Sequence, residues 1–292
     1  MALASTESCP ACGSEVTRIL YQREYRERRW RLARCGTCRQ HFTSPKPTDT
    51  DVQSFYTGEY HSALRSDGGT DVAFGDKYRR YADALARHLS SGRVVDVGCS
   101  TGLLVKMLRD RGYDAEGIEL NEQSAAWGRA HYRVPIHNQP LEKCSFLPGS
   151  LNAVLMTDVL EHTLHPGDFL RAVARLLVPG GFVFVTFPDI RSLESRYQHL
   201  LARLFKRDWM WSACHIPLHT WEFTRATAEA CFAGAGFHIV EFRRTQPPPE
   251  QAGSTTLRLL SLPTRLLCWR ALSRRLGTQM EFVIQCGYKS GS

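Results

Sequence analysis

The segment Arg93–Glu119 constrains the fold of this chain more than any other part of its 292 residues. It begins with a short apolar run, RVVDV, whose aspartate interrupts an otherwise buried strand. A glycine-bounded turn, GCSTG, follows, and residues 103–111 have the apolar spacing of an amphipathic helix that Gly112 ends. The run YDAEGIEL then predicts a second strand that closes on Glu119. The pattern indicates a β-loop-α-β unit with an acidic residue at the tip of its second strand.

The chemistry of this unit is that of a nucleoside site at the carboxyl ends of parallel strands. Gly98 and Gly102 allow the backbone to approach a ligand closely, and the helix amino terminus offers N–H donors to a carboxylate. Glu119 can accept two hydrogen bonds from a ribose diol. The loop spacing is G-x-x-x-G, which differs from the G-x-G-x-x-G of a dinucleotide fold.

At these residues the chain resembles the class I S-adenosylmethionine-dependent methyltransferases. VVDVGCSTG is similar to their first motif, and Glu119 is similar to their ribose-binding acid. The resemblance extends over residues 72–290 through the runs SLNAVLMTDVLEHTLHP, LLVPGGFVFVTFPD, PLHTWEFTRATAEACFAGAGFHIVEF and MEFVIQCGYK, which occur in the expected order. It implies an α/β fold with a seven-stranded Rossmann-like sheet, helices on both faces and a final antiparallel strand.

The resemblance also implies a set of cofactor contacts. The residues expected to bind S-adenosylmethionine are Tyr78, Asp96, Gly98, Ser100, Thr101, Gly102, Glu119, Leu120, Asn138, Gln139, Thr157 and Asp158. Asp96 would lie at the methionine end, and the amides at 138 and 139 stand where the family often has an acid that grips the adenine. Asp158 would face the methyl group, with capping of the following helix as its alternative. The alternative for Tyr78 is an ordinary core position.

The methyl acceptor is less constrained than the cofactor. The position after the fourth strand reads TDVLEH and lacks the Asn/Asp-Pro-Pro-aromatic box typical of amide and ring-nitrogen methylases, which argues against a nucleobase amine as acceptor. A hydroxyl needs a base, and the candidates are His162, His165, His215 and His219. We favour His219; for each of these histidines the alternative is a structural role. The aromatic residues expected to contact the acceptor are Tyr56, Tyr60, Trp209 and Trp211.

Two Cys-x-x-Cys pairs, Cys9 with Cys12 and Cys35 with Cys38, lie near the amino terminus. Together they offer the four thiolates of a tetrahedral zinc site. The runs VTRILYQRE and RRWRLARC between the pairs alternate apolar and charged residues, which predicts a β-hairpin. A closed four-thiolate site has no open coordination position, so we expect structural Zn²⁺ and no catalysis there. The other six of the ten cysteines are scattered singly, as in a cytosolic protein.

These features divide the chain into three parts. Residues 1–46 are expected to form the zinc ribbon, 47–71 a connecting and capping segment, and 72–292 the methyltransferase domain, with insertions at about 190–218 and 251–278. The formal net charge of +8 is concentrated in two stretches: 15–46 carries +6 and 241–292 carries +5. There is no secretory signal and no apolar run of membrane-spanning length, so the expected location is the cytoplasm.

Three functions remain open on this evidence. The favoured one is methylation of a small-molecule hydroxyl, because a zinc ribbon before this fold resembles bacterial enzymes of sugar and natural-product biosynthesis. The second is an RNA or protein methyltransferase that docks through the basic ribbon. The third is a catalytically silent binding or scaffold protein. Nucleic acid and a membrane surface are the less favoured partners, and the chain is expected to be a monomer or a homodimer.

Overall fold

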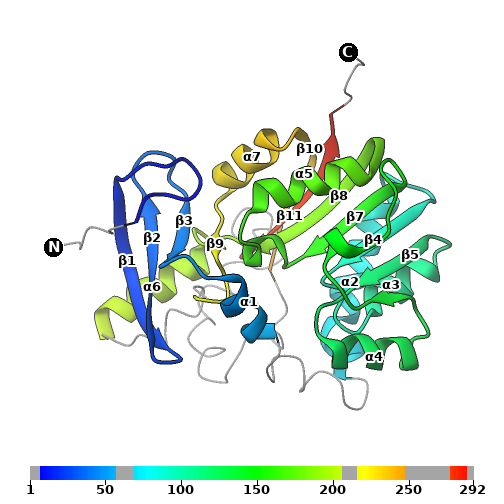
Figure 1. The fold of residues 1–292 in the computed structure, drawn as a ribbon, viewed down its shortest axis with the longest axis horizontal. Helices are drawn as coiled ribbons and strands as arrows, with labels where there is room; N and C mark the ends of the chain where they lie inside the picture. The colour runs from blue at the N-terminus through cyan, green and yellow to red at the C-terminus, as the bar shows by residue number, and fades with distance from the viewer. Residues whose placement is uncertain (1–6, 57–68, 206–215, 247–276, 288–292) are drawn as a thin grey trace.

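The computed structural model describes residues 7–56, 69–205, 216–246 and 277–287. Within these ranges the chain forms one sheet of seven strands and one of four (Figure 1). The strands of the larger sheet lie in the order β10-β11-β8-β7-β4-β5-β6. Their bounds are β4 Arg93–Val97, β5 Asp114–Ile118, β6 Ile136–His137, β7 Leu151–Thr157, β8 Leu177–Pro188, β10 Phe237–Thr245 and β11 Gln279–Cys286.

The larger sheet is parallel from β8 to β6, and β11 runs antiparallel between β8 and β10. This confirms the predicted seven-stranded sheet and its antiparallel last strand. Val97 of β4 lies opposite Ile118 of β5 and Met156 of β7, so the three strands end level. The residues that follow these ends therefore meet at one edge of the sheet, where the predicted cofactor site lies.

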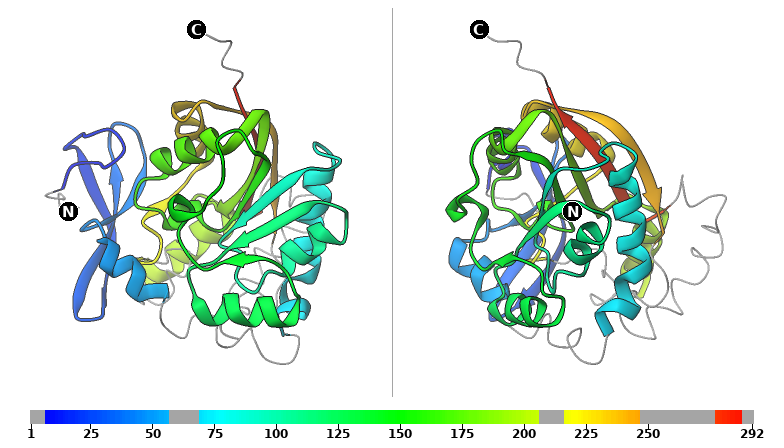
Figure 2. Two further views of the ribbon diagram at one scale, coloured as in Figure 1. Left: turned by 45° about the vertical axis from the view of Figure 1, so that its right-hand side comes forward. Right: turned by 90° about the vertical axis from the view of Figure 1, so that its right-hand side faces the viewer.

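Helices cover both faces of this sheet (Figure 2). Successive residues of β4 point to opposite faces, as the two-residue period of a strand requires. Val94 packs in one core with Leu104, whereas Val95 packs in the other with Val173 and Phe232. The first core lies under α2 (Gly69–Ala86) and α3 (Leu103–Arg109), and the second lies under α5 (Pro166–Leu176) and α7 (Arg225–Gly234); α4 spans Glu122–His131.

The smaller sheet begins with the predicted hairpin of the zinc ribbon. Its order is β1-β2-β3-β9, and all its pairings are antiparallel. The hairpin turns at Arg26 and Glu27, whose φ values of 51° and 59° are those a tight two-residue hairpin needs. The last strand comes from the second half of the chain, so the sheet joins the ribbon to the rest of the molecule (Figure 1). The bounds are β1 Thr17–Tyr25, β2 Arg28–Cys35, β3 His41–Ser44 and β9 Trp221–Glu222.

The connecting segment contains a helix that we did not predict, α1 (Asp49–Tyr56). Its start has a reciprocal cap: the Thr48 backbone N–H donates to the Asp51 carboxylate at 2.8 Å, and the Asp51 N–H donates to the Thr48 hydroxyl at 3.1 Å. The Arg28 guanidinium also contacts Asp51 at 3.0 Å, which ties α1 to the hairpin. A further helix, α6 (Leu193–Phe205), lies in the predicted insertion after β8.

Several predicted residues fall outside what the structure describes. Tyr60, Trp209, Trp211 and His215 lie outside the described ranges, as does most of the insertion at 251–278. Tyr56 is the last residue of α1, but its side chain is not among those described. Among the described helices, none combines the length and the apolar character that crossing a membrane requires.

Candidate active site

The loop after β4 is held in shape by the end of β5. The N–H groups of Gly98 and Cys99 both donate to the Ile118 carbonyl, at 2.8 and 3.0 Å. Gly98 and Gly102 have φ values of 72° and 78°, in the left-handed region that favours glycine. A Cβ at Gly98 would lie 2.6 Å from the Val159 side chain, in the segment that follows β7. The Gly98 position therefore serves the packing of this loop against the segment after β7.

Glu119 lies directly beside this loop with 5% of its surface exposed. Its carboxylate accepts the Ser100 N–H at 2.8 Å and the Asn121 N–H at 2.7 Å. Burial raises the pKa of Glu119, and the backbone N–H groups oppose that shift. The two bonds fix the orientation of the carboxylate, and each oxygen retains a second lone pair for a hydroxyl donor. A carboxylate held in this way can accept hydrogen bonds from the two hydroxyls of a diol.

Asp96 supplies an acceptor without a partner at the end of β4. It is 2% exposed, and within the described part of the chain its Oδ1 accepts no hydrogen bond. Burial raises the pKa of Asp96, and the nearby Glu119 carboxylate raises it further. Burial is also the main cause of the raised pKa of Tyr78, to which Asp96 and Asp158 contribute. A buried carboxylate needs a donor or a cation, and the ammonium group of S-adenosylmethionine is both, so these residues fit that cofactor.

Asp158 pairs with a residue that we had not predicted. Lys77 of α2 contacts its carboxylate at 2.7 Å, and the side chains of Thr186 and Gln279 also donate to it. Burial opposes the charge of both partners, but the ion pair lowers the pKa of Asp158 and raises that of Lys77. The short helix that follows begins after Val159 without a side-chain cap. The alternative of helix capping by Asp158 is therefore wrong, because the carboxylate is bound to Lys77 instead.

The structure brings together two of the predicted bases. The rings of His162 and His219 pack edge to face with centroids 4.7 Å apart. A backbone hydrogen bond joins the segment that carries His162 to the segment that carries His219: the Thr220 N–H donates to the Glu161 carbonyl at 2.9 Å. His219 is 5% exposed, and its Nδ1 contacts the buried Glu222 carboxylate at 3.0 Å. Burial lowers the pKa of His219 to about 4, so its imidazole is neutral at pH 7.

Glu161 completes this cluster. One carboxylate oxygen of Glu161 and one ring nitrogen each of His162 and His219 lie within 4.8 Å of one another. Neither carboxylate oxygen of Glu161 has a hydrogen-bond partner among the described residues, and burial raises its pKa well above the usual range. One carboxylate and two imidazoles can transfer protons, and they are also donors that suit a divalent metal. The predicted base His165 lies apart, on the surface, where its ring contacts Lys46 at 3.1 Å.

The remaining cofactor candidates surround the ends of β5, β6 and β7. The side-chain amide of Asn138 donates to the carbonyls of Glu119 and Leu120, at 2.8 and 3.1 Å. The Gln139 amide donates instead to the Lys143 carbonyl at 3.1 Å. Both NH₂ groups thus hold the backbone of this region. The Leu120 side chain is half exposed, and Thr157 is the last residue of β7.

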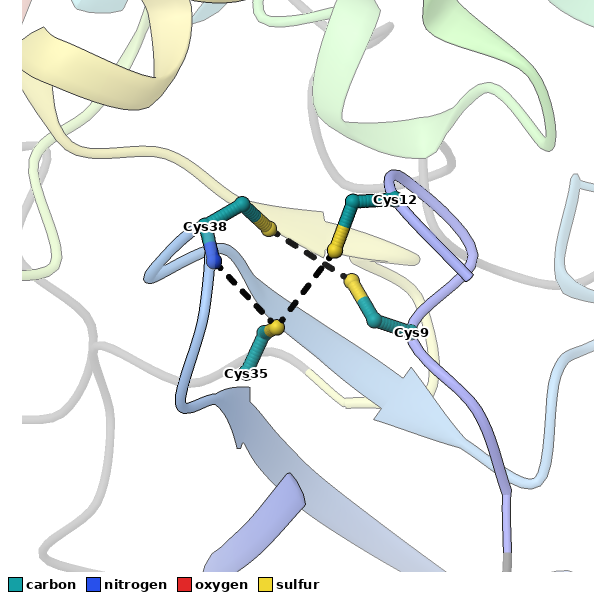
Figure 3. Close-up of side chains that lie close together, drawn as sticks. All are labelled: Cys9, Cys12, Cys35 and Cys38. Carbon is teal, nitrogen blue, oxygen red and sulfur yellow. Dashed lines mark hydrogen bonds between the residues drawn. The ribbon is translucent and has the colours of Figure 1, made fainter. Parts of the chain in front are cut away.

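The four predicted zinc ligands converge beside the hairpin (Figure 3). The sulfur of Cys9 lies 3.6 Å from that of Cys38, and the sulfur of Cys12 lies 3.6 Å from that of Cys35. Thiolates bound tetrahedrally at ~2.3 Å from one ion lie roughly 3.8 Å apart, so the spacing fits zinc. The N–H groups of residues 37 and 38 point at the Cys35 sulfur, at 3.3 and 3.4 Å. Such bonds stabilise a thiolate.

Comparison with known proteins agrees with this geometry. A curated relative, the ubiquinone biosynthesis O-methyltransferase of Dechloromonas aromatica, is 35% identical over 104 residues, which cover 34% of this chain and 45% of that protein. The chain thus spans less than half the length of this relative.

Solved structures share the fold at low sequence identity. A chain from the complex between the Haloferax volcanii Trm112 methyltransferase activator and a methyltransferase is 17% identical with a TM-score of 0.58, covering 81% of this chain and 100% of that one. A SAM-dependent methyltransferase from Archaeoglobus fulgidus is 14% identical with a TM-score of 0.52, covering 77% and 97%.

A family model described as a methyltransferase domain matches residues 73–242. This range includes the glycine loop, Glu119 and the end of β7, which are the parts that form the candidate cofactor site. Since the match covers more than half of the sequence, the chain belongs to the methyltransferase domain family.

Proposed function

We propose that this protein transfers a methyl group from S-adenosylmethionine to an acidic hydroxyl of a small molecule. The observation that carries the proposal is the buried Glu222–His219 pair packed on His162. His162 follows the end of β7, whereas His219 and Glu222 come from the segment just before and within β9. Val159, in the same segment as His162, lies against Gly98 of the glycine loop. A potential base therefore lies next to the candidate cofactor site.

The cofactor residues would act mainly by positioning. When bound, S-adenosylmethionine supplies an electrophilic methyl group on a positively charged sulfur. Glu119 would hold the ribose hydroxyls, and Asp96 would pair with the ammonium group at the methionine end. Fixing one reactant in this way lowers the entropic cost of an in-line displacement. The Lys77–Asp158 pair would keep the end of β7 in place beside the acceptor.

The histidine pair also indicates the class of acceptor. When the Nδ1–H of His219 donates to Glu222, the imidazole carries its lone pair on Nε2 and can accept a hydroxyl proton. Its pKa of about 4 makes it a weak base. A weak base suits a phenol or an enol, whose proton is easily lost, better than an aliphatic alcohol. The relative from Dechloromonas aromatica, named an O-methyltransferase, supports transfer to oxygen.

The docking alternative has less support from the described residues. Several arginines of the hairpin are engaged within the protein: Arg28 contacts Asp51 and lies over the Trp30 ring, and Arg29 contacts Glu24. Oδ1 of Asp96, which has no partner among the described residues, favours a protein that binds the cofactor over a silent scaffold that does not.

The experiment has a binding arm and a transfer arm. Calorimetry should detect S-adenosylmethionine binding that Glu119→Ala weakens strongly. Methyl-labelled cofactor should then label phenols and not amines. His219→Gln should slow transfer by roughly 10²-fold or more, as loss of a general base does, with unchanged cofactor affinity.

The wild-type rate should fall as the pH falls through about 4, because protonated His219 cannot accept a proton. If S-adenosylmethionine binds but no hydroxyl is methylated, the proposed class of acceptor is wrong. If S-adenosylmethionine does not bind, the proposal that the protein is a methyltransferase enzyme is wrong.

A further inference from the structure

A cavity of about 480 Å³ opens between the amino ends of α6 and α7. Its walls are the segment after β8, the first turns of both helices and Arg244 at the end of β10. Among the described residues predicted to contact the cofactor or to act as a base, none lines it. These residues therefore do not account for the cavity.

Arginines dominate the charge of this cavity. Among the described residues, its lining includes Arg191, Arg196, Arg225 and Arg244 but only two carboxylates, Asp189 and Glu229. Both carboxylates are already paired, Asp189 with Arg244 and Glu229 with Arg225. In the part of the chain that the structure describes, no carboxylate forms an ion pair with Arg191 or Arg196. Two exposed guanidinium groups thus remain for an external anion.

Two arginines of the zinc ribbon, Arg18 and Arg34, add positive charge near Arg191, whereas the lowered pKa of His41 keeps that residue neutral at pH 7. Arg18, Arg34 and His41 lie opposite one another across β1, β2 and β3, so their side chains share one face of the smaller sheet. His41 is 6% exposed, and its Nδ1 has no partner among the described residues. The charges of Arg34 and Arg191, after burial itself, lower the pKa of His41. Arg191 is thus close enough to act on the ribbon and also lines the cavity.

Two features hold the cavity in a shape suited to an anion. The guanidinium groups of Arg225 and Arg244 lie 4.4 and 5.7 Å from the Phe242 ring centroid, which restricts both side chains. The helices α6 and α7 both begin at the cavity, so the positive ends of their dipoles add to the arginine charges.

We propose that this cavity binds a phosphorylated small molecule, with Arg191 and Arg196 as its phosphate ligands. Guanidinium groups pair with phosphate oxygens through bidentate hydrogen bonds, and the several oxygens of one phosphate group allow Arg191 and Arg196 to bind it at the same time. The volume lies in the range of small-molecule sites, roughly 300–1,000 Å³, and exceeds what a lone phosphate fills. The described lining has no aromatic side chain on which a base could stack, which favours a small molecule over RNA.

The test uses the zinc-loaded full chain and inorganic pyrophosphate as the probe. Titration calorimetry at low salt should show binding by the wild type. Arg191→Gln/Arg196→Gln should weaken it roughly tenfold or more, since each charged hydrogen bond to phosphate contributes about a tenfold factor. Arg196→Lys, which keeps the charge but loses the fork of donors, should give an intermediate affinity. S-adenosylmethionine binding should be unchanged in all of these variants, which separates this proposal from the proposed function.

A matched control removes the same charge elsewhere. Arg29→Gln/Arg175→Gln changes two exposed arginines that do not line the cavity, and it should leave pyrophosphate affinity within about twofold at low salt. No wild-type binding at millimolar pyrophosphate, or an equal loss in this control, would overturn the proposal. So would a short single-stranded RNA that binds more tightly than pyrophosphate through the same two arginines.

Discussion

His41 shows how a single buried side chain makes the stability of the fold depend on pH. Burial, followed by the charges of Arg34, Arg191 and His199, lowers its pKa from 6.5 to about 4. The unfolded chain takes up a proton as the pH falls below 6.5, whereas the folded chain stays neutral until about 4. The unfolded state therefore binds more protons in this window, so stability is present above it and is lost as the pH falls.

We therefore expect His41→Gln to remove part of the acid sensitivity of the fold. Between pH 7 and pH 5 the wild type should lose about 2 kcal/mol more free energy of unfolding than the variant. Urea unfolding at the two pH values measures this difference, and any effect of zinc is shared by both proteins. The exposed His131→Gln serves as the control and should behave like the wild type. Parallel losses in wild type and His41→Gln would contradict the assigned role.

At the scale of single residues, the sequence predicted a residue's position correctly where that position depends on its own backbone or on residues close to it in the chain. Gly98, Gly102 and Glu119 fall where the local pattern predicts, because the loop between two adjacent parallel strands leaves them few other positions. Lys77 was missed because its partner Asp158 is 81 residues away and only the packing of α2 on the sheet brings them together. The Glu222 partner of His219 lies on β9, which the sequence pattern does not mark as a strand.

At the scale of elements, the four cysteines clamp the ends of the hairpin. Cys9 and Cys12 precede β1, whereas Cys35 ends β2 and Cys38 lies in the turn before β3. We expect about one zinc per chain, and we expect Cys12→Ser to lose it because three thiolates leave the tetrahedral site open. Metal analysis measures the zinc, and amide exchange in β1 and β2 should quicken when it is lost. Cys144→Ser, outside the cluster, should keep the metal; a wild type without zinc would refute the assignment.

Long elements with a clear period were predictable, and short or non-local ones were not. The strands β4, β7 and β8 carry largely apolar runs, so their type follows from burial. The helix α1 has no clear apolar period, although the Thr48–Asp51 capping pattern could have revealed its start. A two-residue strand such as β9 forms only because β3 is already there to pair with it, and local sequence carries no signal of that.

At the scale of the whole molecule, the ribbon shares its core with the methyltransferase sheet. Phe42 of β3 and Cys35 of β2 are buried in the same apolar cluster as Val185 of β8 and Phe232 of α7. The pairing of His41 with Glu222 and of Phe42 with Trp221 adds backbone hydrogen bonds across the same boundary. The expected boundary between ribbon and methyltransferase domain follows the order of the sequence. In the structure, the two parts also pack against each other in one apolar core. The composition of each segment does not reveal this contact.

A shared core has a thermodynamic consequence. If the ribbon and the larger sheet unfold together, calorimetry of the zinc-loaded chain should give one transition whose calorimetric and van't Hoff enthalpies agree. Phe42→Ala should then lower the free energy of unfolding of the whole chain by about 3–5 kcal/mol, because the 2% exposed ring would leave a cavity in that core. Leu147→Ala, at a side chain 69% exposed, should change it by less than about 0.5 kcal/mol. Two separate transitions, with only the smaller one moved by Phe42→Ala, would mean that the ribbon folds on its own and only rests against the sheet.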